Sequence, residues 1–199
     1  LIADPVDIVA AMPVVGAQHD QIALPGDLFG KNRENSKGLD LSNETTLAAL
    51  AGALAGTAAK QWHAAPLLAD GSTAGETSDV LNPADHRDIF GSVTEIKAEH
   101  AERIVAMAAD SVAAWAATSP AERAACLDRA ADLMEARIES LMGIIMREAG
   151  KSAANAIGEV REAVDFLRYY AEQARRTLGP SHLPLGPIVC ISPWNFPLA

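Results

Sequence analysis

The chain has 199 residues, of which 49% are hydrophobic and 21% are charged, and its formal net charge is −10. This length and apolar content are enough to bury a core, which excludes a disordered polypeptide. The excess of acidic residues argues against binding to nucleic acid and against an electrostatic membrane anchor, because negatively charged side chains repel negatively charged phosphate groups. Two cysteines without a C-x-x-C spacing predict neither a zinc site nor a disulfide framework, and they favour a reducing cytoplasm.

Residues 1–42 are predicted to form a connector. The segment is rich in turn-forming pairs such as Asp4-Pro5 and Pro25-Gly26, and it has little apolar periodicity. It opens without the basic and apolar regions of a signal peptide, and its apolar runs are too short to span a bilayer. The chain is interpreted as an internal piece of a longer protein, and its connector as either an ordered tether or a mobile linker.

Helices dominate the prediction for residues 43–186. Asn43 is expected to cap an alanine-rich helix that runs to about residue 60. Gly52 and Gly56 within it indicate close packing against a neighbour. Two short strands around a turn are expected between residues 80 and 93. This part of the chain is therefore predicted to be mostly α-helical with a few short strands.

Apolar residues at helical spacing predict three long helices after the strands. The first covers about residues 104–115. The second begins at the capping box Ser119-Pro120-Ala121-Glu122, which has proline at the first helical position, and Gly150 ends it. The third runs from near Ser152 to Gly179.

Two sides of the third helix carry distinct patterns. One side alternates in charge at spacings of three and four residues, which predicts a solvated, ion-paired face. Its residues are Arg161, Asp165, Arg168 and Glu172. The other side combines one acid with aromatic rings, at Glu162, Phe166, Tyr169 and Tyr170. The helix is therefore expected to contact neighbours on two sides.

The last segment changes from a helical to a strand-like pattern. Residues 187–191 form a continuous apolar run, which is typical of a strand buried on both faces of a parallel sheet. Ser192-Pro193 then ends the strand in a loop. Asn195 is therefore expected near the carboxyl end of a sheet, where α/β proteins bind ligands. Such a strand needs neighbouring strands and covering helices, so it cannot stand alone.

The string Pro193-Trp194-Asn195-Phe196-Pro197 resembles the aldehyde dehydrogenase superfamily. Asn82-Pro83-Ala84 with Gly91-Ser92-Val93 resembles the early strand pair of that family, and residues 148–171 resemble its helix leading into the nucleotide domain. Together these motifs cover roughly residues 60–199. For the string alone, an ordinary turn with a packed tryptophan remains the alternative.

The resemblance implies an α/β fold of the Rossmann type for the parent protein. Residues 43–186 are then the helical amino-terminal part of its aldehyde dehydrogenase module. Residues 187–199 are the incomplete start of its NAD-binding domain and include the first nucleotide-domain strand.

Site residues follow from the same resemblance. Asn195 is expected to donate its side-chain amide to the oxygen that gains charge when a cysteine thiolate attacks an aldehyde. The strand end and loop are expected to line NAD through Ile191, Ser192, Pro193, Trp194 and Asn195. Neither Cys126 nor Cys190 matches the position of the family's nucleophile, and its glutamate base also lies downstream. The chain by itself is therefore expected to be inactive.

A narrower resemblance is to the glutamate-semialdehyde (pyrroline-5-carboxylate) dehydrogenase branch. It rests on residues 192–196 and on the helix that carries Glu162. It implies that Glu162 and Phe196 lie at the substrate, with the acid facing the ammonium group of the substrate or orienting a water. The alternatives are a half-exposed acid paired with Arg161 or Arg168, and core packing of the Phe196 ring.

Residues 25–41 resemble the segment that joins the two catalytic modules of bacterial proline utilization A, a family of bifunctional flavoenzymes. These enzymes oxidise proline with FAD and then oxidise the resulting semialdehyde with NAD. The resemblance implies that residues 1–42 are an interdomain connector, and that the parent oxidises L-glutamate γ-semialdehyde to glutamate. The remainder of the parent polypeptide is then a partner.

Two other functions stay open. One is an aldehyde dehydrogenase of another substrate, such as succinate semialdehyde, and the other is a helical packing module without catalysis. A homo-oligomer and a peripheral membrane association of the parent are also left open.

Overall fold

The computed structural model describes residues 3–73 and 75–199, and the chain divides into two compact units between Asn35 and Ser36. The first unit holds a short helix, α1 (Pro5–Ala11), and a single 3-10 turn, η1 (Pro25–Asp27). Asp4 caps α1, because its carboxylate accepts a hydrogen bond from the Val6 amide at 2.8 Å. The Asp4-Pro5 pair, which suggests a turn in the sequence, is instead the start of a helix, with Pro5 at its first position.

The second unit starts with residues 36–42 and continues into α2 (Glu44–Ala58). Asn43 caps α2 as predicted, since its side-chain oxygen accepts hydrogen bonds from the amides of Thr45 and Thr46 at 3.0 and 3.1 Å.

The expected close packing at Gly52 and Gly56 is wrong for the described residues, because a Cβ built at either glycine would meet nothing within 4 Å. Helix α2 contacts the core through Leu50 and Leu54, which lie on a different face from the glycines. The close approach instead involves Gly143, where an added Cβ would lie 2.5 Å from the Thr57 hydroxyl oxygen.

A three-stranded sheet follows, in the order β1-β3-β2. Its strands are β1 (Trp62–Ala64), β2 (Glu76–Asn82) and β3 (Asp85–Glu95). The antiparallel pair of β2 and β3 turns at Pro83-Ala84, which confirms the predicted strand pair. Strand β1 runs parallel to β3, and a Cβ at Gly91 would lie 2.2 Å from the carbonyl oxygen of Trp62. Only glycine fits at position 91 without moving β1.

The first two predicted long helices are each divided in two. A 3-10 turn, η2 (Ala98–His100), leads into α3 (Ala101–Asp110), and α4 (Val112–Ala117) follows after Ser111. The Ser111 hydroxyl donates to the carbonyl oxygen of Ala108 at 2.7 Å, a local bond that competes with the helical pattern.

The second predicted helix is α5 (Pro120–Glu135) and α6 (Ile138–Ala149), separated at Arg137, whose φ and ψ are −125° and 23°. The apolar stripe does not reveal this break, because residues on both sides of it face the same core. The capping box at Ser119 and Glu122 and the left-handed Gly150 at the end of α6 are as predicted.

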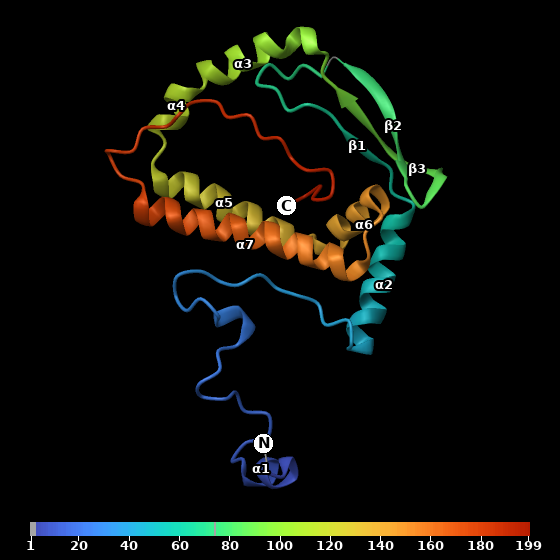
Figure 1. The fold of residues 1–199 in the computed structure, drawn as a ribbon, viewed down its shortest axis with the longest axis vertical. Helices are drawn as coiled ribbons and strands as arrows, with labels where there is room; N and C mark the ends of the chain where they lie inside the picture. Colours follow the sequence, from blue (N-terminus) through green and yellow to red (C-terminus); the bar gives the residue numbers. More distant parts are fainter. Residues whose placement is uncertain (1–2, 74) are drawn as a thin grey trace. The chain divides into compact units, whose positions relative to one another are not determined.

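Helix α7 (Ala153–Thr177), capped by Ser152, lies alongside α5 (Figure 1). The core forms where α2, α5, α6 and α7 meet. Its buried members are Leu50, Ala131, Ile138, Met142, Ile145, Ala156, Ile157, Val160 and Val164. Each large side chain among them contributes about 1.5–3 kcal/mol by leaving water.

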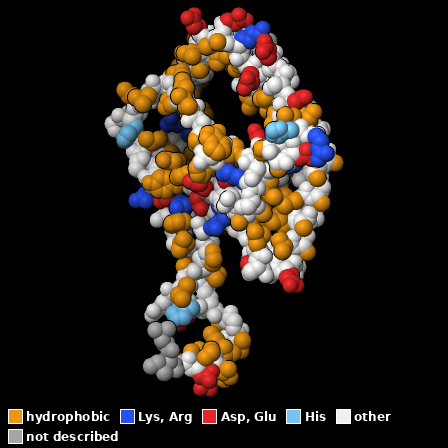
Figure 2. Space-filling view, turned by 45° about the vertical axis from the view of Figure 1, so that its right-hand side comes forward, with side chains coloured by type: hydrophobic (Ala, Val, Ile, Leu, Met, Phe, Trp, Pro, Cys, Tyr) orange, Lys and Arg blue, Asp and Glu red, His pale blue; other side chains and the backbone are white. Residues whose placement is uncertain are grey.

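Residues 178–199 form neither helix nor strand. The strand predicted at residues 187–191 is therefore absent here, and Ile188, Val189 and Ile191 are largely exposed rather than buried on both faces. A parallel strand forms only beside a hydrogen-bonded neighbour, and none of the described strands pairs with this segment. Cys190 is accordingly exposed as well. Figure 2 shows hydrophobic side chains over much of the visible face of the chain.

None of the helices within residues 3–73 and 75–199 combines the length and the apolar character needed to cross a membrane.

Candidate functional site

The outer side of α7 presents an acid beside an aromatic cluster. The apolar stripe of the helix buries Val160 and Val164, so Glu162 points to the surface and is exposed. One turn further along lies Phe166, whose ring centroid is 6.2 Å from that of Tyr170. The structure therefore brings Glu162 and exposed aromatic rings onto one side of α7, as the sequence predicts.

The charged side of α7 is not the solvated face that the sequence predicts. The Arg168 side chain is only 8% exposed, and its guanidinium donates to both carboxylate oxygens of Glu135 on α5, at 3.2 and 3.0 Å. Asp165 accepts hydrogen bonds from the amide and the hydroxyl of Ser36 at 2.9 and 2.7 Å, and Arg161 donates to the same hydroxyl at 3.2 Å. Helix α5 and the segment from Ser36 thus cover this face, which a helical pattern cannot reveal.

The motif at residues 193–197 forms a turn that is open to solvent. The Phe196 amide donates to the carbonyl oxygen of Pro193 at 3.3 Å, which closes the turn around Trp194 and Asn195. Trp194 is 89% exposed, and Asn195 is exposed too. In the described part of the chain the Asn195 side chain has no hydrogen-bond partner, so its amide is available to a ligand.

An ion pair at the start of α7 holds the chain that follows this turn. Lys151 pairs with the buried carboxylate of Glu159, and its ammonium nitrogen lies 4.8 Å from the centroid of the Phe196 ring. The free oxygen of Glu159 accepts a hydrogen bond from the Leu198 amide at 2.6 Å. Phe196 itself remains 40% exposed, so one face of its ring stays accessible.

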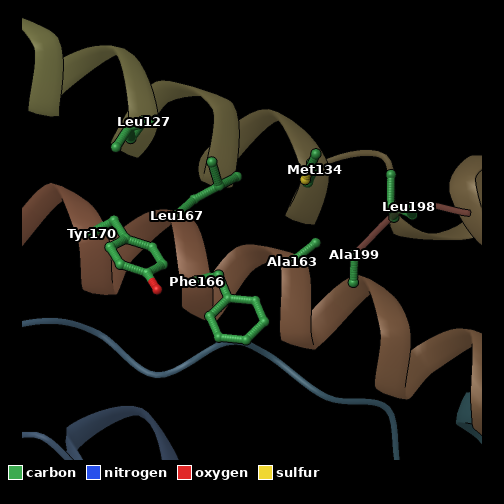
Figure 3. Close-up of a pocket in the computed structure, with 8 residues that line it drawn as sticks. All are labelled: Leu127, Met134, Ala163, Phe166, Leu167, Tyr170, Leu198 and Ala199. Carbon is green, nitrogen blue, oxygen red and sulfur yellow. The ribbon is translucent and has the colours of Figure 1, made fainter. Parts of the chain in front are cut away.

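An apolar groove of about 210 Å³ lies between α5 and α7 (Figure 3). Leu127 and Met134 come from α5, four residues come from α7, and Leu198 and Ala199 close it at one end. The α7 residues are Ala163, Phe166, Leu167 and Tyr170. The groove therefore connects the aromatic side of α7 with the residues directly after the Asn195 turn.

The Asn195 turn and the α7 helix both fall within a match to a known family. The model of the aldehyde dehydrogenase family matches residues 70–199. The chain belongs to the aldehyde dehydrogenase family. The expected fold class is confirmed, since this is a part of an aldehyde dehydrogenase that is about half helical and has one small sheet.

Similar proteins refine this membership of the aldehyde dehydrogenase family. The bifunctional protein PutA of Rhizobium meliloti is 65% identical over 200 residues, which cover 100% of this chain and 16% of PutA. An alpha-ketoglutaric semialdehyde dehydrogenase of Bacillus subtilis is 40% identical over 141 residues, which cover 64% of this chain and 29% of that enzyme. A Thermus 1-pyrroline-5-carboxylate dehydrogenase with bound NAD superposes with a TM-score of 0.70 at 25% identity, over 83% of this chain and 35% of that one. This chain is thus a small part of the length of such proteins.

Two residues of this aldehyde dehydrogenase segment escape sequence reasoning. Lys151 contacts the Phe196 ring and Glu159 accepts a hydrogen bond from the Leu198 amide, yet neither stands out as a site residue in the sequence. One signal does exist. Glu159 lies three residues after Ala156 and four before Ala163, and both alanines are buried, so an acid occupies the apolar stripe of α7.

Proposed function

We propose that this chain forms part of an NAD-dependent aldehyde dehydrogenase that oxidises L-glutamate γ-semialdehyde to glutamate, within a bifunctional protein of the proline utilization A kind. One observation carries the proposal. The similarity to PutA extends over 100% of the chain, whereas the family match begins only at residue 70. Residues 1–69 are therefore shared with PutA although they lie outside the aldehyde dehydrogenase match.

Asn195 is the proposed oxyanion donor. When a thiolate attacks the carbonyl carbon of an aldehyde, the carbonyl oxygen gains negative charge, and a fixed N–H donor stabilises that charge. The exposed Asn195 amide supports this role, because no hydrogen bond to residues 3–73 or 75–199 has to break before the amide meets a substrate. Neither Cys126 nor Cys190 is proposed as the nucleophile.

The loop before and at Asn195 is the proposed contact with NAD, which accepts the hydride of the aldehyde when it is bound. Ile191 is 92% exposed and Trp194 is 89% exposed, so both offer apolar surface to a planar ring. Ser192, Pro193 and Asn195 complete the set. The NAD-bound relative from Thermus supports the choice of cofactor. FAD is proposed for the proline-oxidising module of the parent.

Glu162 and Phe196 are the proposed substrate residues. L-Glutamate γ-semialdehyde carries an ammonium group on a short aliphatic chain. An exposed carboxylate beside aromatic rings fits such a group, since the acid attracts the cation and the rings cover the methylenes. The apolar groove next to Phe166 supports this assignment.

The domain organisation is proposed in the same terms. Residues 1–42 are an interdomain connector, residues 43–186 are the helical part of the module, and residues 187–199 begin its NAD-binding domain. Contacts of Ser36 with α7 support an ordered last section of the connector. The rest of the parent polypeptide is the proposed partner and the cytoplasm the proposed location, while a homo-oligomer remains open.

The activity can be tested on the full-length protein that carries this chain. The wild type should reduce NAD when supplied with L-glutamate γ-semialdehyde. Asn195→Ala should lower kcat by about a hundredfold or more and leave the melting temperature unchanged, because the amide makes no hydrogen bond with the described residues. A wild-type protein without NAD-dependent oxidation of this aldehyde would contradict the proposal.

A different substrate is the second candidate, favoured by the 40% identity to an alpha-ketoglutaric semialdehyde dehydrogenase. The aldehyde in that name has no amino group. Comparing kcat/KM of the full-length protein for L-glutamate γ-semialdehyde and for alpha-ketoglutaric semialdehyde distinguishes the two candidate functions. For an amino-bearing substrate, Glu162→Gln should raise KM by about tenfold, since losing one ionic contact costs about 1.4 kcal/mol or more of binding free energy. Equal KM values for wild type and Glu162→Gln would favour the second candidate.

A further inference from the structure

Glu159 is a buried acid that the proposed reaction leaves without a role. The residue is 2% exposed and lies on the apolar face of α7 between buried Ala156 and Ala163. A buried carboxylate is costly unless each oxygen is paired. Here both oxygens are used, one by the ammonium group of Lys151 and the other by the Leu198 amide at 2.6 Å.

The two groups of this ion pair hold the chain on both sides of Pro197. The Lys151 ammonium lies against the ring of Phe196, and Glu159 holds the amide of Leu198, with the Ala199 amide at 3.4 Å from the same oxygen. These contacts come one, three and four residues after Asn195. The Phe196 amide also closes the turn that contains Asn195.

Helix α7 and Lys151 therefore hold the residues that directly follow the proposed oxyanion donor, Asn195. The Lys151–Glu159 pair makes its bonds with a backbone amide and a side-chain ring, so it can hold the turn without touching any ligand. Its burial favours rigidity, because Glu159 loses the hydrogen bond from the Leu198 amide and Lys151 loses its contact with the Phe196 ring if the turn moves away.

We propose that Lys151 and Glu159 are positioning residues for aldehyde oxidation: the pair fixes the turn that presents Asn195 to the carbonyl oxygen and Phe196 to the substrate. The inference rests on the proposed function. An oxyanion donor works only when it is held at hydrogen-bond distance from the developing charge, and a misplacement of about 1 Å can cost about a hundredfold in rate.

The test uses the full-length enzyme with Glu159→Gln, Glu159→Ala, Lys151→Met and Lys151→Arg. Glu159→Ala and Lys151→Met should lower kcat by about 10- to 100-fold, because the oxyanion donor is no longer held in place. Glu159→Gln keeps an oxygen acceptor and Lys151→Arg keeps the charge, so both should recover most of kcat.

Arg168→Met is the matched control. It removes a buried guanidinium from the same helix, whose ion pairs reach Glu135 and Asp132 on α5. It should lower the melting temperature as much as Glu159→Ala does while leaving kcat within about twofold of the wild type. If Glu159→Ala, Lys151→Met and Arg168→Met each lose kcat in proportion to the fall in their melting temperature, the pair has a structural role only and the proposal fails.

A double-mutant cycle shows whether the pair acts through Asn195. In the Asn195→Ala background, Glu159→Ala should lower kcat by no more than about threefold further, because the donor that it positions is already gone. Additive effects would overturn the proposal.

Hydrogen exchange in the same proteins is independent of activity. The peptide covering residues 193–199 should exchange faster in Glu159→Ala than in Arg168→Met. Unchanged exchange would overturn the positioning role even in a protein that oxidises a different aldehyde. Failure of the wild type to oxidise the semialdehyde would, in contrast, contradict only the proposed function.

Discussion

Arg168 illustrates how little a charge pattern says about burial. Its place in an alternating series of charges suggests a surface position, yet its side chain is 8% exposed and its guanidinium binds Glu135, which is 10% exposed. The planar guanidinium matches the two carboxylate oxygens, which is the geometry that offsets the cost of removing both charges from water.

Arg168→Met should destabilise the protein by roughly 3–5 kcal/mol, because the buried carboxylate of Glu135 loses its main cationic partner. Arg176→Met is a suitable control, since the pair between Arg176 and Glu172 is more exposed and such pairs contribute about 0.3–0.5 kcal/mol. Thermal unfolding of the full-length protein checks both. Equal melting temperatures for the two variants would show that the Glu135 carboxylate reaches solvent or another cation.

At the scale of elements, the hairpin of β2 and β3 is tied to α6 by a charged contact. Arg147 on α6 donates to both oxygens of Asp88, at 2.6 and 3.2 Å. Asn82, at the end of β2, donates to the same carboxylate at 3.1 Å. The hydrogen bonds from Arg147 and then from Asn82 lower the pKa of Asp88 below its usual 3.8.

This lowered pKa predicts the direction of a pH effect. The folded state favours the ionised carboxylate, so its contribution to stability is complete above a pH of about 4 and is lost as the pH falls through the lower pKa of the folded state. Proteolysis or hydrogen exchange of residues 76–95 between about pH 5 and pH 2 should report the loosening of the hairpin. In Asp88→Asn, residues 76–95 should be cleaved or exchange faster than in the wild type at pH 5, and these rates should rise less as the pH falls. If the rates of the variant rise with acid as much as those of the wild type, other carboxylates cause the effect.

The predicted helix ends agree best with the structure where a few neighbouring residues determine them. The caps at Asn43 and Ser119 and the stop at Gly150 are all as predicted, because each depends on a few neighbouring residues. The breaks at Ser111 and Arg137 are missed, since the apolar spacing continues across them. The short helix α1 is missed because Asp-Pro is equally compatible with a turn.

At the scale of the whole molecule, the most exposed large apolar residues of the described chain, apart from Leu67, lie in the last segment, and Ile191 at 92% is among them. A segment with this composition normally lies inside a parallel sheet, so it is expected to gain its strand structure from strands of the parent protein. The 16% coverage of PutA agrees with such a larger body.

The isolated 199-residue chain should therefore have no aldehyde dehydrogenase activity, and it should bind NAD at millimolar concentration or not at all. Residues 187–191 form no strand in this chain, so this part of the site must be ordered on binding, and that ordering reduces affinity. Calorimetric titration of the isolated chain with NAD measures this. Tight, saturable binding would show that residues 191–195 form a complete site by themselves.

The sequence by itself determined the family and most of the helices with their caps, because these depend on short motifs and on local spacing. Only the tertiary structure decided which charges are buried and what holds the Asn195 turn. The contacts of Glu159 with Leu198 and of Asp165 with Ser36 join residues 39 and 129 positions apart, and no local pattern encodes such a pairing. The physical reason is that burial depends on what covers a face, and the covering segments here come from distant parts of the chain.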